Sequence, residues 1–279
     1  MIEAQRLHEL EPHVNGIKAI HVPEAGIVDY RQVCARMAEK VESKEENQIF
    51  LASKVVQMSM SGERVVVSTA RGEHEARFVV NCAGLHSDRV TSLTETPKAK
   101  IIPFRGEYFE VIPEAHHLCR NLIYPVPDPS FPFLGVHFTR MIGGGLECGP
   151  NAVLAFAREG YTRTNVNWKD LAETLSYPGF LRLSAKYWRT GLGEMWRSFS
   201  KGAFVRALQR LVPEIEEHHL EAVPAGIRAQ AVTPEGKLVD DFLIQESSRV
   251  IHVGNAPSPA ATSSLNIGRL IVEKLEAHF

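Results

Sequence analysis

Residues 252–264 read HVGNAPSPAATSS and decide how the end of the chain folds. A short apolar strand over 250–253 leads into small residues and two prolines, and a final helix follows. Small side chains let a ligand approach the backbone closely, and the free N–H groups at a helix start favour negative charge. Thr262 and Ser263 are good N-cap residues. The stretch predicts either an ordinary strand–turn–helix connection or one wall of a ligand site.

Composition places the chain among ordinary globular proteins. Of its 279 residues, 44% are hydrophobic and 23% are charged, as in typical soluble domains. A chain of this length can bury a core for one large domain or for two interleaved ones. The formal net charge of -2 gives no overall attraction for a polyanion, so we expect no nucleic-acid partner.

Cysteine spacing and apolar runs indicate the compartment. Cys34, Cys82, Cys119 and Cys148 lie far apart and form no CxxC pair. We therefore expect neither a disulfide framework nor a metal site, and a reducing environment. No apolar run reaches the length of a transmembrane helix, and the acidic start does not resemble a signal peptide. The sequence thus predicts a cytoplasmic protein.

The first hundred residues mix helix and strand signals. A short helical segment ends at Pro12, and Asp29 can cap a helix that runs to about Ser43. Another helix is expected to begin near Ser87, after a buried strand that ends in small residues. The strands are expected at about 17–22, 49–58, 65–69 and 76–81.

The middle of the chain has a different texture. Residues 101–150 contain short strands interrupted by proline and glycine, which is typical of an antiparallel sheet. Residues 168–212 are predicted to be helical. Strands return at about 226–231, 238–245 and 250–253 before the final helix. The sequence therefore predicts an α/β (α+β) fold with an antiparallel sheet inserted between two stretches of α/β character.

Two arginines are candidates for binding a carboxylate. Arg228 lies in a small-residue strand, where its guanidinium can form two parallel hydrogen bonds with a substrate carboxylate. The alternative is a structural ion pair with Asp240 or Asp241. For Arg105 the simpler expectation is a structural role, anchoring a turn or pairing with Glu107, and a place in a ligand pocket is the alternative.

His137 is the candidate base. It lies on an alternating strand in which Val136 and Phe138 share the other face. An imidazole suits proton abstraction near neutral pH. The alternative is a hydrogen-bonded structural histidine.

Two further segments invite a functional interpretation. Residues 143–150 read GGGLECGP, but they match no phosphate-loop pattern and lie within strand-like sequence, so a hairpin turn is expected. Residues 180–210 interleave seven basic residues with aromatic ones. Such helices can lie on anionic membrane surfaces, or their aromatic side chains can simply pack on the sheet.

Taken together, these segments resemble the D-amino-acid-oxidase-like flavoproteins, and within them the L-2-hydroxyglutarate oxidase/dehydrogenase group. The resemblance covers essentially the whole chain and follows one order. The segments that carry it are GIVDY (26–30), PFRGEYF (103–109), LIYPVPDP (122–129), PFLGVHFT (132–139), GPNAVLAF (149–156), Gly160-Tyr161, AGIRAQA (225–231) and NAPSPAATS (255–263).

In that family the chain begins with a strand, a GxGxxG loop and a helix that hold the ADP part of FAD. This sequence contains no such unit. The resemblance thus implies an incomplete FAD-binding Rossmann-like domain, formed by residues 1–100 and 223–279, with an inserted antiparallel-sheet substrate domain at 101–222. It also implies that a separate N-terminal FAD-binding segment would complete the fold.

The resemblance assigns residues to the cofactor and to the substrate. It implies that Val56 contacts the adenine side of FAD and that Ala83 and Gly84 line the approach to the flavin. Arg228 matches the carboxylate-binding arginine of the family, Tyr124 and Arg105 are pocket partners, and His137 is the base that we select. The turn that presents backbone N–H groups to the isoalloxazine comprises Ser258, Pro259, Ala260, Ala261 and Thr262.

The implied activity is oxidation of L-2-hydroxyglutarate, a small 2-hydroxy dicarboxylate, to 2-oxoglutarate, with the hydride passing to FAD. Electrons would then pass to O2 or to a membrane quinone, and 180–210 would hold the enzyme on the inner face of a membrane. Two alternatives stay open. The chain could be an inactive or accessory fragment that binds no FAD alone, or an amino-acid oxidase of the same fold.

Overall fold

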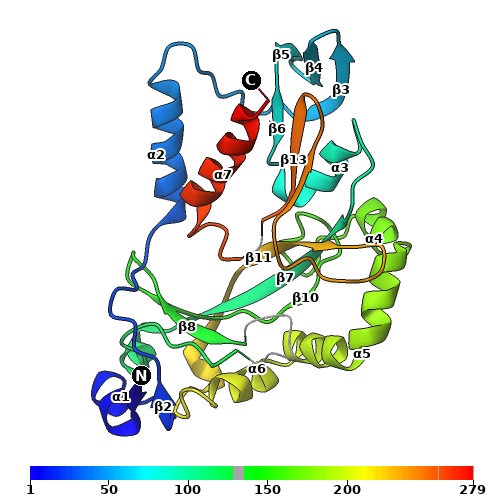
Figure 1. Cartoon of the computed structure of the whole chain (residues 1–279). Helices are drawn as coiled ribbons and strands as arrows, with labels where there is room; N and C mark the ends of the chain where they lie inside the picture. The colour runs from blue at the N-terminus through cyan, green and yellow to red at the C-terminus, as the bar shows by residue number, and fades with distance from the viewer. Residues whose placement is uncertain (128–134, 257, 279) are drawn as a thin grey trace. The chain divides into compact units, whose positions relative to one another are not determined.

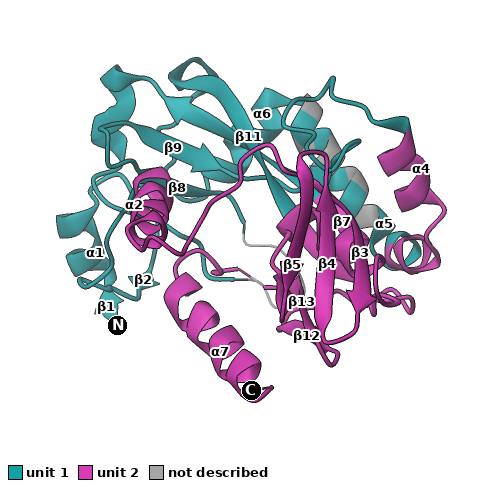
Figure 2. Cartoon of the chain, turned by 90° about the horizontal axis from the view of Figure 1, so that it is seen from above, with its two compact units in different colours: residues 1–29, 104–168, 184–228 teal, residues 30–103, 169–183, 229–279 magenta. Residues whose placement is uncertain are grey.

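The computed structural model describes residues 1–127, 135–256 and 258–278, and it divides into two compact units (Figures 1 and 2). Unit 1 comprises Met1–Asp29, Phe104–Trp168 and Ser184–Arg228, and unit 2 comprises Tyr30–Pro103, Lys169–Leu183 and Ala229–Phe279. The chain passes from one unit to the other five times, and three of these crossings lie within the long elements β7 (Lys100–Val111), α5 (Pro178–Phe199) and β11 (Leu220–Val232).

Unit 1 is built on the antiparallel sheet that the sequence predicts. Its strand order is β10-β7-β9-β8, and β11 pairs with β7. The short strands are β8 (His137–Arg140), β9 (Leu146–Gly149) and β10 (Val153–Leu154). Met141 N–H donates to the carbonyl of Gly145 at 3.1 Å, and Gly144 and Gly145 have φ of 97° and 126°. The glycine run is therefore a hairpin turn, as predicted, and its positive φ values require glycine.

The core of unit 1 lies between this sheet and α6 (Lys201–Leu208). The rings of Phe109 and Phe204 are 4.7 Å apart, and both side chains belong to the buried cluster. The N-terminal elements β1 (Ile2–Glu3), α1 (Ala4–Leu10) and β2 (Lys18–Ala19) are also part of this unit, as are the 3-10 turns η2 (Pro113–Leu118) and η3 (Glu217–His219). β11 begins six residues before the predicted strand 226–231 and runs through Pro224, which a strand tolerates where the missing N–H faces no partner.

Unit 2 contains two three-stranded sheets. One is an antiparallel meander of β3 (Val55–Ser61), β4 (Arg64–Thr69) and β5 (Gly72–Ala76). The other has the order β12-β13-β6, formed by β12 (Leu243–Glu246), β13 (Val250–Asn255) and β6 (Val79–Asn81). Met58, Val65 and Val250 form the buried centre of a cluster that both sheets share. The prediction of one strand over 76–81 was wrong in one respect. β5 ends at Ala76 and β6 begins at Val79, and the two strands belong to different sheets.

Helices complete unit 2. α2 (Tyr30–Glu42) and α3 (Ser87–Thr91) begin where the sequence predicts. α4 (Trp168–Leu175) opens the predicted helical region. α7 (Ser264–Glu276) is the predicted final helix, but Ser263 at its N-cap position makes no side-chain capping bond. Among the described helices, none is both long and apolar enough to cross a membrane.

Candidate functional site

The carboxyl ends of two parallel strands meet at one edge of unit 2. β13 pairs with β6 in parallel, with Val250 opposite Val79 and His252 opposite Asn81. Ala83 and Gly84 follow β6, and the turn 258–262 follows β13. In open α/β sheets, ligands bind in the crevice outside the carboxyl ends of the strands. The structure therefore brings two of the predicted cofactor segments to the same sheet edge.

Both segments offer an accessible backbone. Gly84 has a φ of 52°, and a Cβ placed on it would meet nothing within 4 Å. Residues 258–262 read SPAAT. All of them are exposed except Ala260, which is half-buried. Thr262 Oγ1 lies 2.9 Å from the hydroxyl of Tyr30. Small residues at both strand ends leave the backbone open to close contact with a ligand.

A buried polar network holds these two segments in place. Asn81 Oδ1 accepts a hydrogen bond from Ala83 N–H at 3.0 Å, and Asn81 Nδ2 lies 3.1 Å from His252 Nδ1. His252 Nε2 lies 2.9 Å from Thr94 Oγ1, and Ser87 Oγ donates to the carbonyl of Gly254 at 3.2 Å. The network thus connects the residues after β6 with the end of β13.

The protonation state of His252 follows from its burial. Its side chain is fully buried, and burial lowers the pKa of the imidazole below its ordinary value of 6.5, against an opposing contribution from Glu95. The neutral ring can accept a hydrogen bond at Nδ1 from Asn81 and donate one from Nε2 to Thr94. We did not single out Asn81 or His252 from the sequence, although each is a polar residue within an apolar strand.

Two predicted site residues of unit 1 lie together, the base His137 and the substrate-binding Tyr124. The rings of Tyr124 and His137 stack with their centroids 4.2 Å apart. His137 Nδ1 lies 3.1 Å from the carbonyl of Gly135, so Nδ1 carries the proton and Nε2 is the basic nitrogen. Burial lowers the pKa of His137, which keeps the ring neutral and able to accept a proton. The neighbouring segment 132–134, part of the resemblance, lies outside the described residues.

Arg105 takes the structural role that was the simpler expectation. It is 4% exposed, and its Nη2 donates to Glu107 Oε1 at 3.1 Å, while Nη1 donates to the carbonyl of Thr162 at 3.3 Å. Its Nε is buried without a hydrogen-bond partner in the described structure. Arg228 is exposed on β11, and Val56 is exposed on β3. The substrate and cofactor roles of these residues stay predictions.

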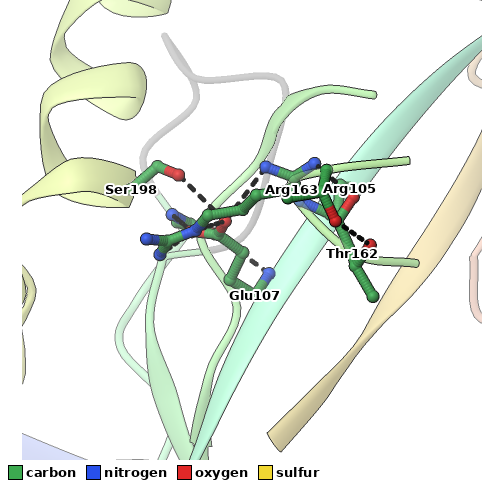
Figure 3. Close-up of polar contacts among 7 residues, drawn as sticks. Arg105, Glu107, Thr162, Arg163 and Ser198 are labelled. Atoms are coloured by element: carbon green, nitrogen blue, oxygen red, sulfur yellow. Dashed lines mark hydrogen bonds and ion pairs between the residues drawn. The ribbon is translucent and has the colours of Figure 1, made fainter. Parts of the chain in front are cut away.

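Glu107 is the centre of a buried cluster, of which the sequence predicted only the pairing with Arg105 (Figure 3). Besides Arg105, its carboxylate accepts hydrogen bonds from Arg163 Nε at 2.8 Å, Ser198 Oγ at 2.9 Å and Asn151 Nδ2 at 2.8 Å. Burial alone would raise the pKa of this carboxyl, but the hydrogen bonds from Arg163, Asn151 and Ser198 hold it below its ordinary value. The carboxyl group of Glu107 is therefore charged at neutral pH.

This cluster forms one side of a cavity of about 550 Å³ within unit 1. The cavity is lined from β7, the segment 161–163, the end of α5, the start of α6, and residues 222–225 of β11. Among the described residues, no group of three or more histidine, cysteine, aspartate or glutamate side chains is arranged to hold a metal ion. The charged groups that line the cavity are instead mostly cationic.

We expect Asn81→Ala to destabilise the chain. The change leaves Ala83 N–H and His252 Nδ1 without their partner, and each buried unsatisfied group costs about 1–3 kcal/mol. The free energy of unfolding in urea should fall by about 2–3 kcal/mol. Asn47→Ala, at an exposed position, is the control and should leave it nearly unchanged. Equal losses in both variants would contradict the network.

We expect His252 to make stability pH-dependent. Because its pKa is lower in the folded than in the unfolded state, the unfolded state binds the proton first as the pH falls below 6.5. The contribution of His252 to the free energy of unfolding is therefore present above pH 6.5. It is lost below that pH, by at most about 1.4 kcal/mol per pH unit. The difference in unfolding free energy between the wild type and His252→Gln should therefore shrink from pH 8 to pH 5. Asn47→Ala, at an exposed position and without a titratable side chain, is the control and should show a constant difference.

Comparisons with known proteins show the family of the chain. The family model described as "FAD dependent oxidoreductase" matches residues 1–274. The L-2-hydroxyglutarate dehydrogenase of Indibacter alkaliphilus is 52% identical over 98% of this chain and 68% of its own length, and that of Escherichia coli strain K12 is 46% identical over 99% and 65%. The mitochondrial L-2-hydroxyglutarate dehydrogenase of Homo sapiens is 39% identical over 100% and 64%.

Solved structures show the same fold at low identity. The L-alpha-glycerophosphate oxidase of Mycoplasma pneumoniae, solved with FAD bound, matches with a TM-score of 0.67 at 17% identity over 99% of this chain and 64% of its own. Glycine oxidase from Bacillus cereus matches with a TM-score of 0.62 at 14% identity over 100% and 64%. The chain spans about two thirds of the length of these relatives. The predicted α/β class and family are confirmed, and the chain belongs to the FAD dependent oxidoreductase family.

Proposed function

We propose that this chain carries the flavin-facing and substrate-binding parts of an FAD-dependent L-2-hydroxyglutarate dehydrogenase. The observation that carries the proposal is the parallel β6–β13 pair, whose ends are followed by small-residue segments, in a chain that is 52% identical to one enzyme of that name. As expected from the sequence, we propose that residues 1–100 and 223–279 bind the cofactor and that residues 101–222 bind the substrate.

The residues at the strand ends fit the flavin. Ala83, Gly84 and the turn 258–262 combine small side chains with accessible backbone, and Val56 is the proposed contact on the adenine side. With FAD bound, the backbone N–H groups of the turn and the start of α7 would stabilise negative charge on the isoalloxazine. FAD, when bound, supplies the two-electron acceptor for the substrate carbon.

The chain's own side chains orient the substrate and move its proton. Arg228 binds the carboxylate next to the reacting carbon, because a guanidinium forms two parallel hydrogen bonds with that group. Nε2 of His137 takes the proton of the hydroxyl group as the α-hydrogen departs with its electron pair, and the product is 2-oxoglutarate. Tyr124 stacks on His137 and fixes the plane of the imidazole. Arg105, held by Glu107, contributes positive charge to the pocket.

We also propose that a separate N-terminal segment holds the ADP part of FAD. The sequence contains no GxGxxG unit, and the chain covers 64–68% of the relatives named above. α2 has no buried residue, and Leu265 and Val272 of α7 are exposed. These apolar positions are suited to contact a further βαβ unit.

Complementation tests both proposals. Expressed alone, the 279-residue chain should be colourless, because its sequence contains no GxGxxG unit to bind the ADP part of FAD. Co-expressed with the N-terminal third of the Indibacter alkaliphilus relative, it should purify with one flavin per complex and reduce an artificial electron acceptor with L-2-hydroxyglutarate. Arg228→Lys should lower kcat/KM at least tenfold, because the paired contact is lost.

The possible results separate the alternatives. A yellow protein from the chain alone would contradict the need for a second segment. A yellow complex that oxidises amino acids and ignores L-2-hydroxyglutarate would indicate an amino-acid oxidase. A complex that binds no flavin and shows no turnover would indicate an accessory fragment.

We propose further that segment 180–210 lies on the inner face of an anionic membrane and that electrons pass to a quinone there. Trp188 and Trp196 are 54% and 64% exposed, and Lys186, Arg206 and Arg210 are exposed as well. Interfacial helices combine such aromatic and basic side chains. The side chains of Arg189 and Arg197 in this segment lie outside the described residues. O2 is the alternative acceptor.

Vesicle binding tests the membrane proposal. The chain should co-sediment with phosphatidylglycerol vesicles, and Trp188→Ala with Trp196→Ala should reduce the bound fraction several-fold, because the apolar anchors are removed. Trp168→Ala is the matched control, since Trp168 is 77% exposed outside the segment. Unchanged co-sedimentation of the double variant would contradict the proposal.

A further inference from the structure

We propose that His252 is a proton-sensitive positioning residue, which holds the backbone of Ala83 through Asn81 while its ring is neutral and releases it when the ring is protonated. The inference goes beyond the proposed function and rests on it only in calling the segment after β6 a cofactor edge. All the residues concerned belong to unit 2, so the argument depends on this unit alone.

Two backbone groups fix the orientation of the Asn81 amide. Ala83 N–H lies 3.0 Å from one end of the amide and can only donate, so that end is the carbonyl oxygen Oδ1. The carbonyl of Ser87 lies 3.0 Å from the other end and can only accept, so that end is the amino group Nδ2. Nδ2 also lies 3.1 Å from His252 Nδ1. Because Nδ2 can only donate, Nδ1 of His252 must accept and carries no proton.

The other ring nitrogen of His252 completes a neutral tautomer. Nε2 lies 2.9 Å from Thr94 Oγ1 and carries the single proton of the neutral ring. The side chain is fully buried, and burial lowers the pKa of the imidazole. The ring is therefore neutral at neutral pH, as the orientation of Asn81 requires.

A second proton on the ring reverses these demands. When a proton from solvent adds to Nδ1 of His252, two donors face each other, because Asn81 Nδ2 has no lone pair to accept it. Rotation of the amide by half a turn relieves this conflict, but it brings Nδ2 to Ala83 N–H, which then loses its acceptor. Gly84 follows directly, and glycine adopts positive and negative φ about equally readily. The released segment can therefore change conformation at the cofactor edge.

Glu95 supplies the charge that a protonated ring needs. Its Oε1 lies 4.0 Å from Nε2 of His252 and is buried without a hydrogen-bond partner among the described residues. Buried polar atoms normally have such a partner. The carboxylate also opposes the effect of burial on the imidazole pKa. This oxygen is thus placed to accept from Nε2–H once the ring is charged.

The elements packed against β13 carry few other charged groups. On α3, Asp88 accepts from a backbone N–H of β7, and Arg89 pairs with α4. On β12, Glu246 pairs with the end of α7. His86 is the titratable side chain of the 3-10 turn η1 (Gly84–His86), so it is replaced in the test. Glu95 is the charged side chain that acts on the imidazole pKa in the described structure.

NMR of the 279-residue chain without flavin tests the inference. With [15N]alanine labelling, the amide signal of Ala83 should shift between pH 8 and pH 5 with the same midpoint as the ring protons of His252. Glu95→Gln should move both midpoints to lower pH, because the charged ring loses its opposite charge. His252→Gln should abolish the shift of Ala83. His86→Gln is the matched control and should keep the wild-type titration.

Several results would overturn the inference. They are an Ala83 signal that stays constant while His252 titrates, a His252 ring that stays neutral down to pH 5, and loss of the Ala83 titration in His86→Gln. Ala172, on α4, reports global unfolding, and a shift of its signal together with that of Ala83 would contradict a local switch.

The titration of the wild type can contradict the inference by itself, so the test does not depend on the folding of any variant. Because no flavin is present, these results are also independent of whether the complemented complex binds flavin or oxidises L-2-hydroxyglutarate.

Discussion

Parallel pairing of β13 with β6 is the constraint on which the candidate cofactor edge depends. The two strands are distant in sequence, and their pairing directs both carboxyl ends to one edge of the sheet. The hydrogen bonds of Asn81 and His252 then fix the register at that edge and hold the segment after β6. A shift of one residue would turn His252 to the other face and break the contact. Pairing and network therefore specify the same arrangement.

In unit 1, one buried carboxylate positions the polar groups. Glu107 lies on β7 and receives donors from a loop, from the strand region at Asn151 and from the end of α5. One carboxylate thus connects β7 with a loop, with the connection between β9 and β10, and with the end of α5. The hydrogen bonds that hold its pKa low also keep it charged, so the cluster keeps its geometry at neutral pH.

Local signals in the sequence were sufficient for the local structure. The start of α2, the helix after Ser87 and the glycine hairpin at 143–145 were predicted, because capping residues and glycines act within a few positions. The break between β5 and β6 was missed because Arg77 and Phe78 carry no turn signal. The site networks were missed because they are long-range, as Asn81 and His252 are 171 residues apart and Glu107 and Ser198 are 91 apart.

The ionic cluster of unit 1 is hard to explain by stability alone. Removing charges from water is costly, and apolar side chains of similar size often serve a buried position equally well. Glu107 and Arg105 lie instead at the wall of a cavity, and one donor of Arg105 lacks a partner in the described structure. A cluster that only braced the fold would complete its own hydrogen bonds. The cluster is therefore better explained by the positions that it fixes at the wall of the cavity, where Arg163 and Lys201 also lie, than by its contribution to stability.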